Sequence, residues 1–132
     1  MIVLDEHILG ADLHDAIAHW YPGQVTDITQ LRTGSLIKDD AVPTLLRAAR
    51  RPTFVTINVE DFWRRVTPHL RFCIVCLVLP SSRAEQIPGC LRRLFAHELF
   101  RTQKLRLGKI VRVTPHHMQY YSTDSWAVQE VE

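Results

Sequence analysis

The most apolar stretch of the chain is residues 72–79, with the sequence FCIVCLVL, and it ends at Pro80-Ser81-Ser82. Eight consecutive apolar residues are far fewer than the roughly 20 that span a bilayer, but they suit a strand buried on both faces. Such a strand is typical of the centre of a parallel sheet that is covered by helices. This run therefore predicts an α/β fold.

Four other segments have the composition of strands, and apolar residues at helical spacing separate them. Residues 2–4 (IVL) are a short apolar run that stops at Asp5, and residues 53–59 (TFVTINV) are rich in β-branched side chains. The remaining two strands are predicted over residues 24–31 and 109–114. Helices are predicted over residues 11–20, from Asp39-Asp40 to Ala49, from Asp61 to Arg65, and from Ile87 until Gly108 ends the segment.

The alternation of strands and helices predicts a three-layer α/β/α domain with a central, mainly parallel sheet of five strands. At 132 residues the chain has the usual size of one domain. We expect a single domain over residues 1–132, with a polar and aromatic tail from about residue 115 that no pattern assigns.

Charge is distributed unevenly, although the formal net charge is only +2. Residues 1–61 contain nine Asp or Glu against five Lys or Arg, whereas residues 83–112 contain eight Lys or Arg against two acids. An acidic end can hold a cation and a basic end can attract phosphate, which favours a nucleic-acid partner. Two ordinary solvated faces of opposite bias are an equally good interpretation of charge alone.

The start of the chain, MIVLDE, has no basic region of the kind that opens a signal peptide, and no run spans a membrane. Three cysteines, an odd number, favour reduced thiols in the cytoplasm over a disulfide framework. Cys73 and Cys76 form a C-x-x-C, but on a strand their odd separation directs them to opposite faces, so we expect core residues. We therefore expect a cytoplasmic protein with no membrane association.

Acidic and amide side chains cluster where predicted strands end and predicted helices begin. Because ligands of such folds bind beyond the carboxyl ends of the strands, these side chains are expected to meet. Converging carboxylates are stabilised by a cation, and hard oxygen ligands suit Mg²⁺ or Mn²⁺. An acid pair at a helix start is as often a cap, whereas an acid directly after a buried strand is less easily explained without a metal. The residues are Asp5, Glu6, Asp39, Asp40, Asn58, Glu60 and Asp61.

Three motifs together resemble the PIN-like nucleases, which include toxins of toxin–antitoxin pairs. The motifs are VLDEH at residues 3–7, KDDAV at residues 38–42 and VTINVEDF at residues 55–62. The resemblance implies a ribonuclease that uses Mg²⁺ or Mn²⁺ to activate water and leaves a 5′-phosphate. It implies an RNA substrate and an antitoxin-like protein inhibitor as partners, and a homodimer remains open.

The resemblance also implies roles for individual residues. Asp5 would be the primary metal ligand, Asp39 or Asp40 the second carboxylate and Asp61 a third acid, so that Asp5, Asp39 and Asp61 form the catalytic set. Glu6, Asp40 and Asn58 would complete the metal site. Asn58 departs from the family, which usually has an Asp in the third-strand motif, and an amide brings no charge to a metal. The alternative function is therefore a non-catalytic PIN-like module that binds protein or RNA through a degenerate site.

Basic residues near an aromatic side chain offer a candidate RNA contact. Arg64 and Arg65 follow Trp63, and this combination can hold bases and phosphates of a single strand. A partly buried anchor is the better interpretation of Trp63. A second basic set could form a phosphate track, although a solvated helix face is commoner; it comprises Arg92, Arg93, Arg101, Lys104 and Arg106.

Overall fold

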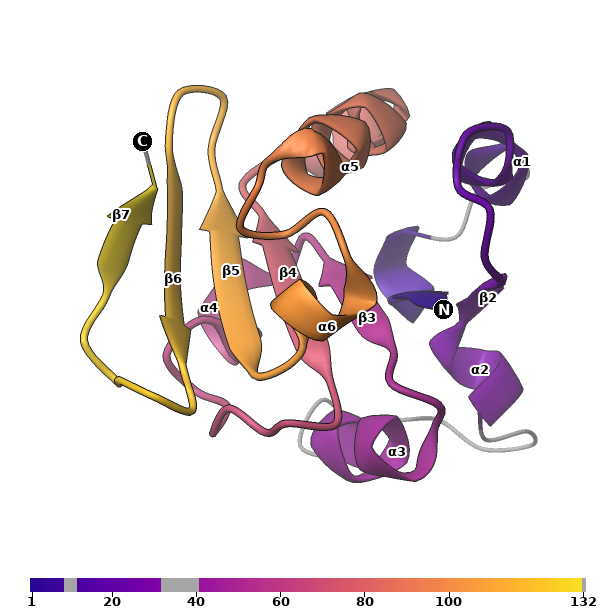
Figure 1. The fold of residues 1–132 in the computed structure, drawn as a ribbon. Coiled ribbons are helices and arrows are strands. Elements are labelled where there is room, and N and C mark those ends of the chain that lie inside the picture. Colours follow the sequence, from indigo (N-terminus) through magenta and orange to yellow (C-terminus); the bar gives the residue numbers. More distant parts are fainter. Residues whose placement is uncertain (9–11, 32–40, 132) are drawn as a thin grey trace.

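The computed structural model describes residues 1–8, 12–31 and 41–131 (Figure 1). Within these ranges the chain is α/β, with one mixed sheet of seven strands and six α-helices. The strands are β1 (Ile2–Leu4), β2 (Val25–Asp27), β3 (Thr53–Thr56), β4 (Cys73–Leu77), β5 (Lys109–Val113), β6 (Met118–Ser122) and β7 (Gln129–Val131). The helices are α1 (Leu13–Ala18), α2 (Ile28–Leu31), α3 (Val42–Ala48), α4 (Val59–Phe62), α5 (Ile87–Ala96) and α6 (Gln103–Arg106), with 3-10 turns η1 (Glu6–Ile8) and η3 (Ser81–Gln86).

The sheet has the strand order β2-β1-β3-β4-β5-β6-β7. Its first five strands pair in parallel, and β6 and β7 add to the edge in antiparallel orientation. The predicted number of five strands is therefore wrong, because the tail that no pattern assigned supplies two more. Residues 118–122 carry only a weak alternation of polar and apolar side chains. Their burial does not alternate either, because the first three are half-buried and the last two are buried. Pairing with the backbone of β5, rather than a local pattern, makes this segment a strand.

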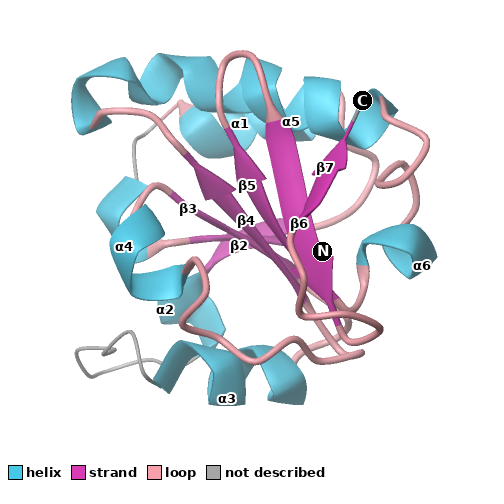
Figure 2. Cartoon of the chain, turned by 90° about the vertical axis from the view of Figure 1, so that its left-hand side faces the viewer, coloured by secondary structure: helices cyan, strands magenta, loops and turns pink. Residues whose placement is uncertain are grey.

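Helices lie against both faces of the sheet (Figure 2). One core cluster joins α1 and α5 to side chains such as Leu4 and Val75, and a second joins α2, α3 and α4 to Phe54 and Ile74. Cys73 belongs to the first cluster and Cys76 to the second. The prediction that these two thiols point to opposite faces of their strand is confirmed.

Two predicted elements are divided in the structure. The strand expected over residues 24–31 ends at Asp27, and α2 follows, because Asp27 Oδ1 accepts a hydrogen bond from Thr29 N (3.0 Å) and caps the helix. The long helix expected to end at Gly108 breaks into α5 and α6. Phe100 is fully buried in the segment between them, and the hydroxyl of Thr102 caps α6 by accepting from Leu105 N.

The helices nearest the predicted acidic site also begin differently from expectation. Helix α3 starts at Val42 with Ala41 at its N-cap, and Pro43 lies in its first turn. The Asp39-Asp40 pair that was expected to open this helix lies outside the described residues. Helix α4 starts at Val59 rather than at Asp61 and ends at Phe62. None of the helices in the described part of the chain is long and apolar enough to cross a membrane.

Candidate functional site

The carboxyl ends of β1 and β3 form the point at which the chain changes direction across the sheet. From β1 the chain runs through α1 on one face to β2, and from β2 it runs through α3 on the other face to β3. Connections that leave neighbouring strands toward opposite faces open a crevice beyond the strand ends, where α/β proteins usually bind ligands. Asp5 follows β1 at this point and Asn58 follows β3.

Asp5 is a buried carboxylate, with 2% of its surface exposed. Its backbone N–H continues the ladder with β3 by donating to Val55 O (2.9 Å), and its Oδ2 accepts a hydrogen bond from Thr56 Oγ1 (2.6 Å). Among the side chains that the structure describes, no Lys, Arg or His nitrogen lies within 4.0 Å of this carboxylate. A buried charge without a basic partner is expensive, and a bound cation is one way to balance it.

A chain of hydrogen bonds leads from Asp5 to Asp61. Thr56 Oγ1, which donates to Asp5, also accepts from Asn58 N (2.9 Å), and Asn58 Nδ2 donates to Asp61 Oδ2 (2.8 Å). Asn58 uses its amide nitrogen in this bond, not the oxygen through which an amide ligates a metal. The structure therefore links three of the predicted site residues through the hydroxyl of Thr56, a residue to which sequence reasoning gave no role.

The other predicted metal ligands have different positions. Glu6 is half-buried in η1, next to Asp5, and Glu60 is exposed in the first turn of α4. Asp39 and Asp40 lie outside the described residues, so the prediction that they join the site stays a prediction. Within residues 1–8, 12–31 and 41–131, no group of three or more His, Cys, Asp or Glu side chains is arranged to hold a metal ion.

The predicted RNA contacts Arg64 and Arg65 lie just beyond α4. The Arg64 guanidinium carbon lies 4.6 Å from the centre of the Tyr121 ring, and Arg64 Nη1 donates to Trp126 O. Arg64 thus holds the tail against α4, and both Arg64 and Arg65 are exposed. Trp63 packs edge-on against Tyr121 with ring centroids 5.1 Å apart, as the anchor interpretation predicts.

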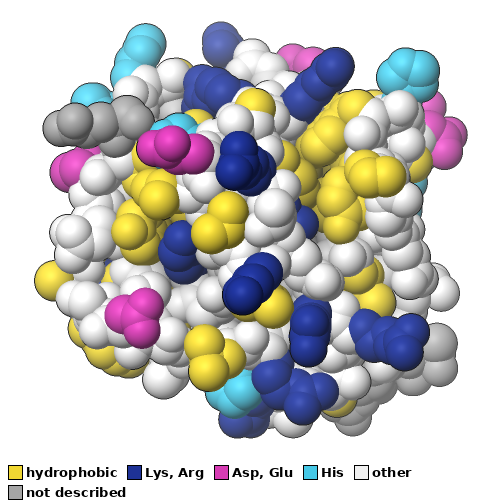
Figure 3. All heavy atoms as spheres, viewed as in Figure 1, with side chains coloured by type: hydrophobic (Ala, Val, Ile, Leu, Met, Phe, Trp, Pro, Cys, Tyr) yellow, Lys and Arg dark blue, Asp and Glu magenta, His cyan; other side chains and the backbone are white. Residues whose placement is uncertain are grey.

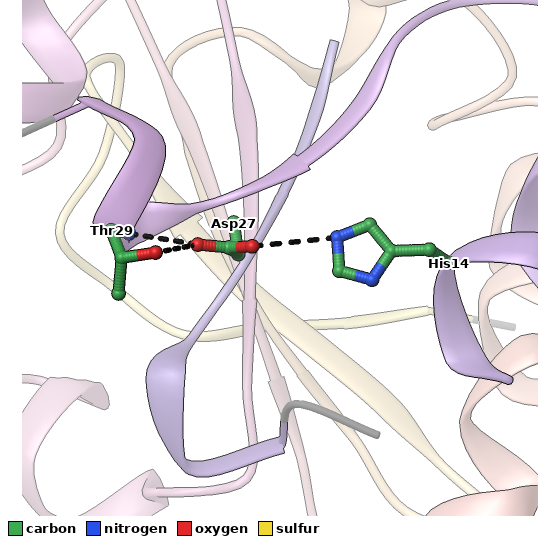
Figure 4. Close-up of polar contacts among 3 residues, drawn as sticks. All are labelled: His14, Asp27 and Thr29. Carbon is green, nitrogen blue, oxygen red and sulfur yellow. Dashed lines mark hydrogen bonds and ion pairs between the residues drawn. The ribbon is translucent and has the colours of Figure 1, made fainter. Parts of the chain in front are cut away.

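Asp27 is an acid at the same edge of the sheet that sequence reasoning missed (Figure 4). It pairs in register with Leu4, the residue before Asp5. Its Oδ1 accepts from the N–H and the hydroxyl of Thr29, and its Oδ2 lies 3.6 Å from His14 Nε2. The available signal was an acid directly after the short run of Val25 and Thr26, the pattern by which Asp5 was found. These contacts give Asp27 a capping role.

The cysteines of β4 are core residues, one on each face of the strand. Burial raises the pKa of the Cys73 thiol to about 12 and raises that of Cys76 as well. The described site is thus a pair of carboxylates, Asp5 and Asp61, joined through Thr56 and Asn58. Its oxygen donors fit a hard divalent cation such as Mg²⁺ or Mn²⁺.

Comparison of the chain with models of protein families, with curated proteins and with solved structures gives no match.

Proposed function

We propose that this chain is a metal-dependent ribonuclease with a PIN-like three-layer α/β/α architecture. One observation carries the proposal: a carboxylate that is only 2% exposed and has no described basic partner lies at the switch point of a doubly wound sheet. Ligands of such folds bind beyond the strand ends, and a carboxylate oxygen is a preferred ligand of Mg²⁺ or Mn²⁺. Asn58 and Asp61 add oxygen atoms from the neighbouring strand end.

Each residue of the site has a distinct task in this proposal. Asp5 holds the metal, and Thr56 fixes the rotamer of Asp5 by donating to Oδ2. Asp61 holds the metal directly or through a water, oriented by Asn58. Glu6, Asp39 and Asp40 supply further carboxylates. A bound Mg²⁺ or Mn²⁺ would lower the pKa of water and offset negative charge on the phosphodiester.

Cleavage of single-stranded RNA tests the proposal. Purified protein should cut RNA with Mn²⁺ or Mg²⁺, and a chelator should abolish cutting. Asp5→Asn should also abolish it, because the amide removes the charge of the buried ligand but keeps its shape. Asp124→Asn is the matched control, since Asp124 is exposed and follows β6 at the opposite end of the sheet. Cleavage that survives both the chelator and Asp5→Asn would rule out the metal mechanism.

A second candidate function is a non-catalytic PIN-like module that binds RNA or a protein. The amide of Asn58, in place of the family's acid, favours this candidate because it removes one negative charge from the metal site. A melting experiment separates the two. If the nuclease proposal is correct, Mn²⁺ raises the melting temperature of the native chain but not of Asp5→Asn. If Mn²⁺ changes neither melting temperature while RNA still binds, the binding module is the better account.

The biological setting is part of the same proposal. A ribonuclease of this kind could serve as a toxin that a partner protein restrains, and such an antitoxin-like inhibitor would have to cover the crevice beside Asp5. Titration of a candidate inhibitor into the cleavage assay would measure this directly. Equal affinity of the inhibitor for Asp5→Asn and for the native chain, measured by direct binding, would place the inhibitor outside the metal ligands.

A further inference from the structure

The opposite edge of the sheet, where the parallel strands begin, contains two neighbouring hollows. The larger, of about 1240 Å³, lies between the end of α3, the segment before β4, and α6. The smaller, of about 490 Å³, lies between the segment before β2, the end of α5, and α6. Gln103 lines both, so the two hollows are neighbours, and we call them together the amino-edge groove.

The larger hollow is strongly basic. Arg50, Arg51, Arg71 and Lys104 line it, all four are exposed, and no Asp or Glu is among the described residues that line either hollow. None of the four lies within 4.0 Å of a described carboxylate oxygen. Figure 3 shows Lys and Arg side chains gathered over the region of α3 and α6. Cations that share one hollow repel one another, so this arrangement is suited to a polyanion.

The wall of the larger hollow is held in place. Gln103 Nε2 donates to Arg51 O (2.9 Å), which ties α6 to the segment before β3. Arg51 has a φ of 50°, a left-handed conformation that only a few per cent of non-glycine residues adopt. Such outliers tend to lie at functional sites. Leu70 lies among the cations with 68% of its surface exposed and offers an apolar contact beside the charges.

The smaller hollow has aromatic walls. Trp20, Tyr21 and Phe95 line it, with ring centroids 5.9–6.1 Å apart, and the Arg106 guanidinium carbon lies 4.0 Å from the centre of the Phe95 ring. The Nε1–H of Trp20 is buried and has no hydrogen-bond partner among the described residues. The volume of the smaller hollow is within the range of about 300–1,000 Å³ that small-molecule sites occupy. An aromatic wall suits a planar group such as a nucleobase.

We propose that the amino-edge groove binds single-stranded nucleic acid, with the phosphates along Arg50, Arg51, Arg71 and Lys104 and one base in the aromatic hollow. A basic track beside an aromatic platform is the combination by which proteins hold single strands. The inference goes beyond the proposed nuclease, because the groove lies at the other end of the strands from Asp5 and its binding needs no metal.

Fluorescence anisotropy in the presence of a chelator tests the phosphate track, with a labelled oligouridylate of about 12 nucleotides as the probe. The double variant Arg71→Gln/Lys104→Gln should weaken binding by about tenfold or more. It should also reduce the slope of log affinity against log salt by about 1.4, because each lost single-strand phosphate contact contributes about 0.7. The matched control is Arg83→Gln/Arg92→Gln, which removes two exposed cations elsewhere and should leave both values unchanged. Equal losses in the two variants would overturn the proposal.

Nuclear magnetic resonance tests the base site. The protein has three tryptophans, and the indole N–H signal of Trp20, assigned with Trp20→Phe, should shift when the oligouridylate is added. A shift confined to Trp126 would place the RNA beside Arg64 instead and overturn the groove. Tighter binding of an RNA duplex of equal length would also overturn it, because a paired base cannot enter the hollow. Chelated conditions keep these results separate from the nuclease test, so either proposal can fail alone.

Discussion

The two ends of the parallel strands differ in charge, although they belong to one sheet. Residues that follow strands include Asp5 and Asp61, whereas residues that precede strands include Arg51, Arg71 and Lys104. The difference follows strand direction and not position in the chain, since Arg51 belongs to the acidic half of the sequence. Parallel strands place all strand exits at one edge and all entries at the other, so a bias in the connections becomes a dipolar surface.

The largest expected effects come from variants that impair the function of one edge of the sheet and leave that of the other edge intact. Asp5→Asn should lower metal-dependent cleavage by more than about 100-fold, because it removes a direct ligand. In chelator the same variant should bind RNA as tightly as the native chain. The Arg71→Gln/Lys104→Gln variant should bind RNA more weakly than the native chain in chelator. It should cleave a substrate that is too short to reach the groove as fast as the native chain does. Cleavage rates and anisotropy on the same preparations check both, and a variant that impairs both properties equally would break the division of labour.

Removal of the hydroxyl that joins the two strand exits should have the next largest effect. Thr56→Val should lower the free energy of unfolding by about 1–3 kcal/mol, because the buried Asp5 carboxylate loses its donor and Asn58 N loses its acceptor. Thr56→Ser keeps the hydroxyl and should retain most of the stability. Urea titrations of the three proteins measure the difference. If Thr56→Val were as stable as Thr56→Ser, the hydrogen-bond chain would have no energetic role.

Alkaline pH tests whether the two edges belong to one cooperative unit. Cys73 opens β4 near the amino edge and Cys76 lies toward the carboxyl edge, and burial raises the pKa of both thiols, to about 12 for Cys73. The folded chain keeps protons that the unfolded chain releases above about pH 8.5, so stability is complete below that pH and declines above it. The expected decline is about 1.4 kcal/mol per pH unit for each thiol.

Urea titrations between about pH 8 and 10.5 measure this decline. Cys73→Ala should make the slope shallower by the share of one thiol, whatever its effect on stability at neutral pH. Thiol-specific labelling should modify Cys73 and Cys76 at the same rate, because both require global opening. Faster labelling of one than the other would show that the edges open separately.

The smallest expected effect concerns Asp27, the capping acid at the carboxyl edge. His14→Gln should change the free energy of unfolding by less than about 0.5 kcal/mol, because the 3.6 Å pair is partly exposed and the N–H and hydroxyl of Thr29 already donate to the carboxylate. Thr29→Val, which removes the side-chain donor, should cost more. Thermal melts at neutral pH rank the two variants, and the opposite ranking would give His14 a larger role than a surface pair has.

Local sequence patterns predicted the elements whose residues are buried on both faces of the sheet. They failed where contacts between residues distant in the sequence determine the structure. Strand β4 could be recognised because every residue of it is buried, and Asp5 because it ends an apolar run. The start of α4 could not, since the turn depends on the Thr56 hydroxyl. The amino-edge groove could not either, because its four cations come from three separate connections and form no motif in the chain.

The hairpin of β6 and β7 has a consequence for the self-association of the protein. Without it, β5 would present an open ladder of backbone groups beside Ile110 and Val111, which are fully buried in the complete sheet. An uncovered strand of that composition is a template on which another copy can polymerise. The present outer strand is only three residues long, with Gln129 and Glu130 exposed. A chain shortened before residue 118 is therefore expected to precipitate rather than remain dispersed.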